Sequence, residues 1–321
     1  MNKELEKLPK VELHIHLDGS VSLELASLLS GLSIKEVTEK MIAKDKCKNL
    51  SEYLTKFDFP ISLMQTKENL TKIAEDLSKR LASQNVIYSE IRFAPMFHTK
   101  EGLTYEEIID AVLEGLQKTS NIKTNLILCM MRGMPKEENL KTIEVAEKYL
   151  NRGVCAIDLA GAEDKYPLDE YLPLFELAKK KGIPFTIHAG ENGSAKEVEK
   201  AINIGATRIG HGIHSIENKE VLELVKNKNI LLEICPTSNI QTNSIDTYQN
   251  HPIKKLYKLG IPLCINTDNS TVSNISLTEE YLKINSHFNF KLNDYRKMNI
   301  NAIQSSFLTE KEKQELLSKL I

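Results

Sequence analysis

The sequence has little of what marks a secreted or membrane protein. Its five cysteines form no CxxC pair, and four of them lie inside apolar runs, where buried free thiols are expected. The first ten residues, MNKELEKLPK, are charged and lack the apolar core of a signal peptide. No run approaches the roughly 18 apolar residues of a membrane span. We therefore expect a protein without disulfides in the reducing cytoplasm.

The sequence also lacks an excess of charge and a glycine-rich phosphate loop. Lysine and arginine number 42 against 44 acidic residues, for a net charge of −2. No basic cluster of the kind that binds nucleic acid is present. Neither GxGxxG nor GxxxxGK[ST] occurs, which argues against the usual dinucleotide and P-loop sites. We expect a small-molecule substrate and neither a nucleic-acid nor a membrane partner, whereas the oligomeric state stays open.

What the chain does contain is eight short apolar runs, typical of buried parallel strands. Amphipathic stretches typical of helices separate most of them. One covers 104–119 and begins with a capping-box pattern at Thr104 and Glu107, and another begins at Ser194 with Glu197 three residues on. The predicted strands are 11–17, 86–95, 125–131, 154–161, 184–191, 207–212, 229–239 and 262–269.

This alternation predicts an α/β fold, the (β/α)8 TIM barrel, in one domain over 1–321. A doubly wound open sheet is the alternative, disfavoured because no glycine-rich turn follows the first strand. Residues 18–85 are too many for one crossover, so we expect a helical insertion after the first strand. It could form a lid over the C-terminal mouth of the barrel or pack outside it. A helical tail at 309–320 is expected on the exterior.

Ionisable side chains gather where the predicted strands end, which is where TIM barrels carry their chemistry. His14 and His16 lie two apart on a strand and therefore share one face. Burying so many ionisable groups at one rim is costly unless a cation or a substrate organises them. The residues at these strand ends are His14, His16, His188, Glu191, His211 and Asp268.

The chemistry of these groups points to a metal. Imidazole and carboxylate ligands suit zinc well and magnesium or calcium poorly, although cobalt, iron and manganese would also be accepted. A catalytic zinc lowers the pKa of bound water from about 16 to roughly 7 and makes hydroxide available at neutral pH. The residues alone therefore predict a metal-dependent hydrolase in which His14 and His16 are ligands.

Seven motifs, in order, resemble those of the adenosine deaminase family, in the metal-dependent amidohydrolase superfamily. The resemblance extends from residue 11 to about residue 308, and its strength lies in the succession of motifs rather than in HxH alone. It implies one zinc per chain and hydrolytic deamination of adenosine, with 2′-deoxyadenosine, to inosine and ammonia in purine salvage. The motifs are VELHIHLDGS, AIDLAGAE, HAGEN, RIGHGIH, CPTSN, INTDN and SSFL.

The same resemblance implies roles for the residues at the strand ends. Glu191 would protonate purine N1, which requires a raised pKa in a dry pocket. His211 and Asp268 would orient the attacking hydroxide, take its proton and pass one to the departing ammonia. The implied zinc ligands are His14, His16, His188 and Asp268.

Substrate contacts also follow from the resemblance. The backbone N–H of Gly161 would face purine N3, where only a residue without a side chain allows close approach. Asp18, together with the region of His16, would meet the ribose hydroxyls. The implied apolar lining, for which core packing is the alternative, is Tyr53, Leu54, Phe57 and Met131.

Asn269 departs from the pattern of many family members, which place a second aspartate against purine N7. An aspartate can donate a hydrogen bond to N7 only when protonated, whereas Asn269 would donate through its amide. Ser270 stands where a proline is common. These changes are compatible with purine binding but leave the pH behaviour and the preferred substrate open.

Other functions compete with this one. Adenine or a modified adenosine could replace adenosine, whereas an AMP deaminase should offer a clustered phosphate site that is not evident. Many related hydrolases use a lysine at the end of the fourth strand to bridge two metals, and AIDLAG has none. A purine-binding protein without catalysis is a further alternative. Glu90 and Arg92 share one face of the second strand, where we expect a buried ion pair.

Overall fold

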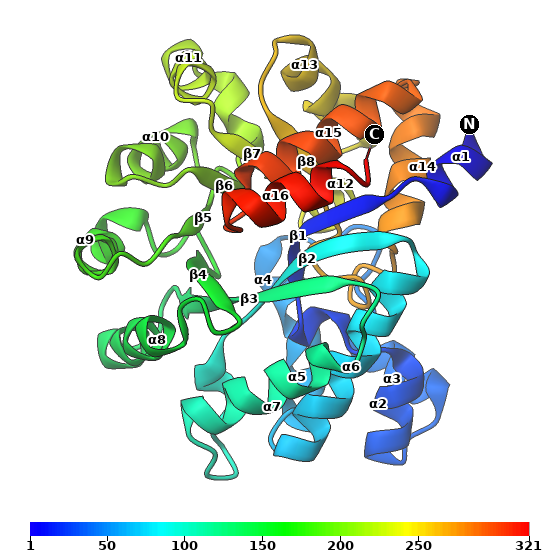
Figure 1. Ribbon diagram of the computed structural model, residues 1–321, viewed down its shortest axis with the longest axis vertical. Helices are drawn as coiled ribbons and strands as arrows, with labels where there is room; N and C mark the ends of the chain where they lie inside the picture. Colours follow the sequence, from blue (N-terminus) through cyan, green and yellow to red (C-terminus); the bar gives the residue numbers. More distant parts are fainter. Residues whose placement is uncertain (321) are drawn as a thin grey trace.

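The computed structural model describes residues 1–320 and contains all eight predicted strands (Figure 1). Neighbouring strands pair in parallel throughout. The last four strands are shorter than predicted, because the residues that follow them leave extended geometry. The strands are β1 (Lys10–His16), β2 (Val86–Phe93), β3 (Lys123–Met131), β4 (Val154–Ala160), β5 (Thr186–Ala189), β6 (Arg208–His211), β7 (Leu231–Ile234) and β8 (Leu263–Ile265).

The strands close into a barrel through two single bridges. They form two four-stranded sheets, β1–β4 and β5–β8. Ile157 bridges to Phe185 at one junction, and Ile15 bridges to Asp268 at the other, both in parallel. The predicted (β/α)8 barrel is thus confirmed, and the open doubly wound sheet was the wrong alternative.

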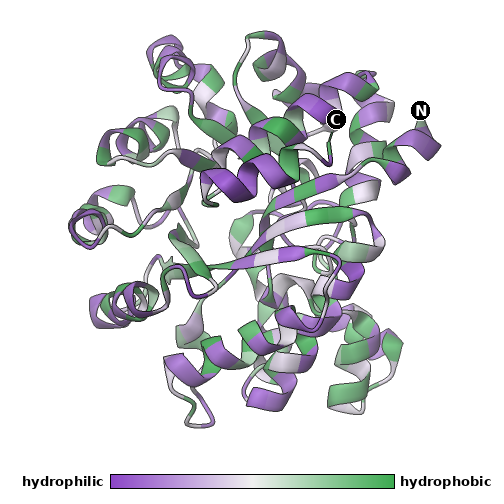
Figure 2. Cartoon of the chain, in the orientation of Figure 1, coloured by the Kyte–Doolittle hydropathy of each residue, from purple (hydrophilic) through white to green (hydrophobic). Residues whose placement is uncertain are grey.

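Helices surround the barrel with apolar faces inward and hydrophilic faces outward (Figure 2). The ring follows the strands in chain order, which is the arrangement that right-handed βαβ crossovers produce. From β2 onward the helices are α7 (Tyr105–Gln117), α8 (Lys136–Tyr149), α9 (Leu172–Lys180), α10 (Ala195–Ile204), α11 (Lys219–Asn227), α12 (Pro236–Gln241), α13 (Ile253–Lys258), α14 (Leu277–Phe288), α15 (Leu292–Ser305) and α16 (Glu310–Leu317).

Local signals in the sequence located some boundaries and misplaced others. The capping box of Thr104 and Glu107 is present at the start of α7. Helix α10 does begin after Ser194, but no side-chain cap forms there. The N–H of Glu197 donates to the carbonyl oxygen of Ser194, and the Glu197 side chain accepts the N–H of Leu168. The predicted strand 229–239 was too long: Pro236 occupies the first turn of α12, where its fixed φ and missing N–H suit a helix start.

The insertion after β1 contains five helices that differ in where they lie on the barrel. Its helices are α2 (Leu23–Ser30), α3 (Ile34–Met41), α4 (Leu50–Leu54), α5 (Asp58–Leu63) and α6 (Lys67–Ser83). Helix α6 packs against α7 and β2 and belongs to the outer ring. Residues of α4 and α5 line a pocket together with residues at the strand ends. Helices α2 and α3 lie toward the outside, where Leu28 is 75% exposed.

The opposite, N-terminal end of the barrel is closed by the C-terminal tail. Leu316 and Leu320 pack in one cluster with Val11, Leu13 and Tyr88, which stand near the starts of β1 and β2. The tail is therefore an exterior helix, as expected. All five cysteines are buried and free. Within residues 1–320, no helix combines the length and apolarity that crossing a membrane requires.

Candidate active site

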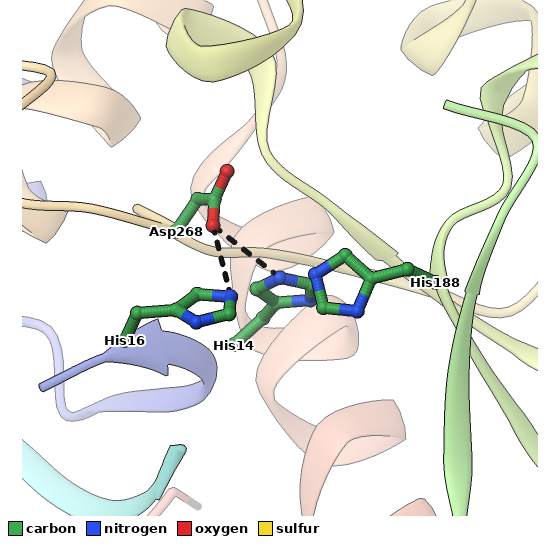
Figure 3. Close-up of side chains that lie close together, drawn as sticks. All are labelled: His14, His16, His188 and Asp268. Carbon is green, nitrogen blue, oxygen red and sulfur yellow. Dashed lines mark ion pairs between the residues drawn. The ribbon is translucent and has the colours of Figure 1, made fainter. Parts of the chain in front are cut away.

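His14, His16, His188 and Asp268 converge at the C-terminal end of the barrel (Figure 3). One ligand atom from each of the four lies within 4.8 Å of those of the others. Asp268 Oδ1 is 3.3 Å from His16 Nε2 and 3.5 Å from His14 Nε2. The four side chains come from β1, β5 and the loop after β8, so residues 254 positions apart in the chain share one site.

The backbone holds Asp268 beside the first strand. Its N–H donates to the carbonyl of His14 at 2.9 Å, and its own carbonyl accepts the N–H of His16 at 2.7 Å. Asp268 adopts the left-handed conformation with φ +63°, which is unfavourable for a non-glycine residue. Ser238 Oγ donates to Asp268 Oδ2 at 2.6 Å, which leaves Oδ1 facing the histidines. These hydrogen bonds therefore hold Asp268 in an unfavourable backbone conformation and orient its carboxylate toward the histidines.

Buried carboxylates orient two of the imidazoles. Glu233 Oε2 lies 2.8 Å from His14 Nδ1, and Asp158 Oδ2 lies 2.8 Å from His188 Nδ1. Because an ionised carboxylate can only accept, His14 carries its proton on Nδ1 and turns its Nε2 lone pair toward the site, while the charge of Asp158 close to His188 Nδ1 favours a proton on that nitrogen as well. Sequence analysis gave no role to Asp158 or Glu233, although an acid in the middle of an apolar strand was a signal.

Arg92 joins these two carboxylates. Its guanidinium donates to Asp158 Oδ2 and to Glu233 Oε2, each at 2.8 Å, and all three groups are fully buried. The expected buried ion pairing is present, but Glu90 and Arg92 do not pair with each other. Glu90 instead pairs with Arg208, which also donates to Glu233 Oε1 at 2.7 Å. Burial opposes ionisation of Glu233, yet Arg92 and Arg208 hold its pKa well below the usual value.

The four-residue group fits a zinc ion. His14 Nε2 is buried and has no hydrogen-bond partner, which is costly unless a cation occupies its lone pair. Three imidazole nitrogens and one carboxylate oxygen are the donor set that zinc accepts readily. A second, overlapping group adds His211 and Cys235 to His14 and Asp268. Burial raises the pKa of Cys235 well above its usual value, so this thiol stays protonated and is a poor ligand.

Electrostatics favour a neutral His16 and an ionised Asp268. Burial lowers the pKa of His16 well below its usual value, despite the nearby charge of Asp268. Burial also opposes ionisation of Asp268, but the imidazoles of His14, His16 and His211 close to its carboxylate outweigh burial. The pKa of Asp268 is therefore held well below the usual value. Neutral imidazole and ionised carboxylate are the forms that bind metal.

Glu191 stands on the turn that leaves β5. Burial, then the charges of Asp268 and Glu163, raise its pKa well above the usual value, which favours the protonated form of this carboxyl group. Thr242 Oγ1 donates to its Oε1 at 3.3 Å, and His211 Nε2 lies 3.6 Å from its Oε2. Glu191, the acid expected from the sequence, is therefore buried beside the four metal-ligand residues but is not one of them.

A pocket of about 460 Å³ opens onto this cluster. Its size lies within the range of small-molecule sites. Every residue that the resemblance implied for substrate contact borders it, and Tyr53, Leu54 and Phe57 also pack together in a small hydrophobic cluster. The implied residues found in its wall are Asp18, Tyr53, Leu54, Phe57, Met131, Gly161 and Asn269, together with His16, His188, Glu191, His211 and Asp268.

Two glycines allow the wall of this pocket to form. Gly161 has φ +104°, and a Cβ there would lie 3.3 Å from that of Arg132. A Cβ on Gly19 would lie only 2.0 Å from Asn269 Oδ1, so this glycine is what lets Asn269 reach its place. Asn269 Oδ1 is buried without a hydrogen-bond partner. Burial raises the pKa of Asp18 to about 7.

A parallel barrel that brings together a histidine-rich N/O donor set and a buried carboxyl group at one pocket is typical of a metal-dependent hydrolase of the amidohydrolase type. The adenosine deaminase family model matches residues 9–321. A protein of Shewanella woodyi named adenosine deaminase is 42% identical over 97% of this chain and 98% of its own. The chain therefore belongs to the adenosine deaminase family.

Solved structures agree with this membership. Adenine deaminase from Arthrobacter aurescens superposes with a TM-score of 0.88 at 25% identity, over 98% of both chains. The N6-methyl-AMP deaminase of Arabidopsis thaliana superposes with a TM-score of 0.85 at 28% identity, over 98% of this chain and 97% of its own. This chain is thus similar to deaminases named for a nucleoside (adenosine), a base (adenine) and a nucleotide (N6-methyl-AMP).

Proposed function

We propose that this protein catalyses the zinc-dependent hydrolytic deamination of adenosine to inosine, and of 2′-deoxyadenosine to 2′-deoxyinosine, with release of ammonia, in purine salvage. The observation that carries the proposal is one pocket that holds His16, His188 and Asp268 of the metal-ligand group, the raised-pKa carboxyl of Glu191 and an apolar wall. Its relatives by sequence are named for the same reaction.

His14, His16, His188 and Asp268 would hold one zinc ion per chain. Bound zinc would lower the pKa of a water molecule and so supply a nucleophile at neutral pH. His14 Nε2, which is buried without a hydrogen-bond partner, supports this assignment. The carboxylates of Glu233 and Asp158, which lie 2.8 Å from the Nδ1 atoms of His14 and His188, support it as well. Those carboxylates raise the basicity of the imidazoles and fix their orientation.

Three side chains, those of Glu191, Asp268 and His211, would act on the reacting atoms. Glu191 would donate its proton to purine N1, so that the ring can accept electrons as C6 is attacked. A carboxyl group with a raised pKa is suited to this role. Asp268 and His211 would orient the attacking water, and the proton removed from it would pass to the amino group that leaves as ammonia.

Substrate recognition would combine polar and apolar contacts. The N–H of Gly161 would donate to purine N3 and the amide of Asn269 to N7. Asp18 would accept from the ribose hydroxyls, and the ring would stack within an apolar wall. The residues proposed for that wall are Tyr53, Leu54, Phe57 and Met131.

Charge in the pocket favours a nucleoside over a nucleotide. Among its lining residues, Lys100 is the one lysine or arginine, whereas Asp18 and Asp58 both border the same space. A phosphate would meet two carboxylates there, and like charges in a partly desolvated pocket repel. We further propose that residues 1–321 act as one catalytic domain, with the segment of α4 and α5 within 18–85 as a lid.

The test is an ultraviolet assay of the purified, zinc-loaded protein with adenosine, 2′-deoxyadenosine, adenine and N6-methyl-AMP in parallel, with metal analysis of the same sample. We expect conversion of both nucleosides and about one zinc per chain. Conversion of adenine alone would refute the role given to Asp18. Conversion of N6-methyl-AMP alone would refute the charge argument, and activity without bound metal would refute the zinc assignment.

A further inference from the structure

Three buried polar side chains form a hydrogen-bonded row behind the pocket. Asn239 Nδ2 lies 3.0 Å from His211 Nδ1, and Asn239 Oδ1 lies 3.3 Å from His251 Nε2. All three residues are almost completely buried. Asn239 ends the CPTSN motif and follows β7, while His251 immediately precedes the turn into α13. Nothing in the deamination chemistry above uses Asn239 or His251.

The direction of every hydrogen bond in this row follows from one backbone donor. The N–H of Ile253, in the first turn of α13, donates to His251 Nδ1 at 3.2 Å. A first-turn N–H has no acceptor within its own helix, so this bond caps the helix. A nitrogen that accepts carries no proton, and burial lowers the pKa of His251 to about 3. The ring is therefore neutral, with its proton on Nε2.

That proton decides how the amide of Asn239 is turned. Because His251 Nε2 donates, the atom of Asn239 that faces it must be the acceptor, Oδ1. The Nδ2 amino group then faces His211 and donates to its Nδ1. His211 Nδ1 thus accepts, and the proton of the neutral ring lies on Nε2. That nitrogen is buried, has no partner within the described residues, and points to the side of the ring where Glu191 lies.

We propose that His251 and Asn239 are positioning residues that hold His211 in its Nε2–H tautomer, so that His211 meets the reacting atoms as a hydrogen-bond donor. The catalytic half of this inference rests on the proposed function; the tautomer itself does not. His211 in this form cannot accept a proton on Nε2. When water attacks C6, its O–H bond breaks and the proton passes to a carboxylate oxygen of Asp268, while His211 keeps its own proton and hydrogen-bonds to the attacking oxygen.

The first test observes the tautomer directly. Protein labelled with ¹⁵N at its eight histidines is studied by NMR with and without zinc, which is diamagnetic. The His211 signals are assigned by their loss in His211→Gln. We expect a proton on Nε2 and a bare Nδ1 in His211, and the same pattern in His251. A proton on Nδ1 of His211, or on both of its nitrogens, would overturn the inference whatever the activity.

The second test replaces the amide group that donates to His211 Nδ1. In Asn239→Asp, a carboxylate that can only accept replaces the amide, so His211 Nδ1 must carry a proton. We expect the His211 signals to change accordingly and kcat for adenosine to fall about 100-fold, with KM and zinc content within about threefold. Asn299→Asp, which also buries a carboxylate but lies far from the pocket in α15, should leave kcat within about threefold.

Variants of His251 separate positioning from packing. His251→Gln keeps an N–H that can reach Asn239 Oδ1, so we expect the Nε2–H tautomer of His211 and near-normal kcat. His251→Phe fills the space but removes the donor, so a mixture of tautomers and a kcat reduced about tenfold are expected. Equal kcat in both variants would refute positioning by His251. A correct tautomer in a protein inactive on all four purines would instead refute the proposed function alone.

Discussion

The carboxylate of Glu163 accepts a hydrogen bond from the backbone N–H of Glu191 at 3.0 Å. It also accepts the N–H groups of three neighbours in the same turn, Gly190, Asn192 and Gly193, at distances of 2.6 to 3.2 Å. One buried carboxylate therefore shapes the whole turn that carries the proposed acid. The N–H of His214 also donates to the carbonyl oxygen of Gly190 at 3.1 Å, but the four successive N–H groups of the turn all depend on the Glu163 carboxylate.

Glu163→Gln should reduce activity without loss of metal. The amide replaces one acceptor oxygen by a donor that faces backbone N–H groups, and each charge-assisted bond contributes about 1.5–3 kcal/mol. We expect kcat for adenosine to fall at least about tenfold, measured beside zinc content. Asp164→Asn, which removes an exposed neighbouring charge, is the matched control and should stay near normal. Normal kcat in Glu163→Gln would show that the turn keeps its geometry without the Glu163 carboxylate.

Glu191→Gln should abolish most turnover while zinc stays bound. Glutamine is nearly the same size but cannot give a proton to purine N1, and general acid catalysis contributes about 10²–10⁴-fold. The assay is steady-state deamination of adenosine, with metal analysis of the same preparation. Turnover that survives within about tenfold of normal would mean that another group protonates the ring.

Asp268→Ala should lose both zinc and activity, because it removes the oxygen that lies next to His14 and His16. Ser238→Ala is the control: it deletes one hydrogen bond to the same carboxylate and keeps the ligand. We expect zinc affinity to fall far more in the first variant than in the second, as measured by competition with a chelator. Full zinc occupancy in Asp268→Ala would remove Asp268 from the ligand set.

Arg92→Lys should weaken zinc binding although the charge is retained. A lysine cannot donate in the fork geometry that links Asp158 and Glu233, so the two carboxylates behind the imidazoles lose their common anchor. Loss of such outer partners typically costs about 10–100-fold in metal affinity. Chelator competition measures this loss, and Arg152→Lys at the surface serves as the control. Unchanged affinity in Arg92→Lys would contradict the orienting role.

Glu280→Gln should stabilise the protein at alkaline pH only. Glu280 is buried in α14, its Oε2 has no partner, and burial raises its pKa from 4.5 to about 7. The unfolded chain therefore ionises first, so stability is lost as pH rises from 4.5 to 7, by up to about 3 kcal/mol. Chemical denaturation at about pH 8 should show the gain and at about pH 4.5 little change. A similar gain at both pH values would refute this titration.

Much of the barrel was predictable because its strands are buried on both faces. Such strands read as apolar runs, and the polar residues that interrupt them at their ends stand out, as His188 and Asp268 do. The ends of strands were harder to place. Pro236 starts a helix inside a predicted strand, where the mostly polar residues of α12 are nevertheless buried. Periodicity cannot separate a buried strand from a buried helix over so few residues.

Supporting residues were beyond the reach of sequence patterns. Arg92 was predicted to pair with Glu90, its neighbour on the same strand face, yet it pairs across the barrel with Asp158 and Glu233. Glu163 and Asn239 lay inside recognised motifs, but no local signal assigned them a bond. Such partners come from strands and loops that are distant in the chain, so their pairing is a property of the closed barrel.

The sequence by itself therefore determined the alternation of strands and helices, the family, and the residue types gathered at the strand ends. Those are set by local polarity and by short motifs. Only the tertiary structure decided which buried charges neutralise each other, how the Glu191 turn is held and on which nitrogen His211 carries its proton. These depend on distances between residues such as Asn239 and His211, because burial makes it costly to leave a polar atom without a partner.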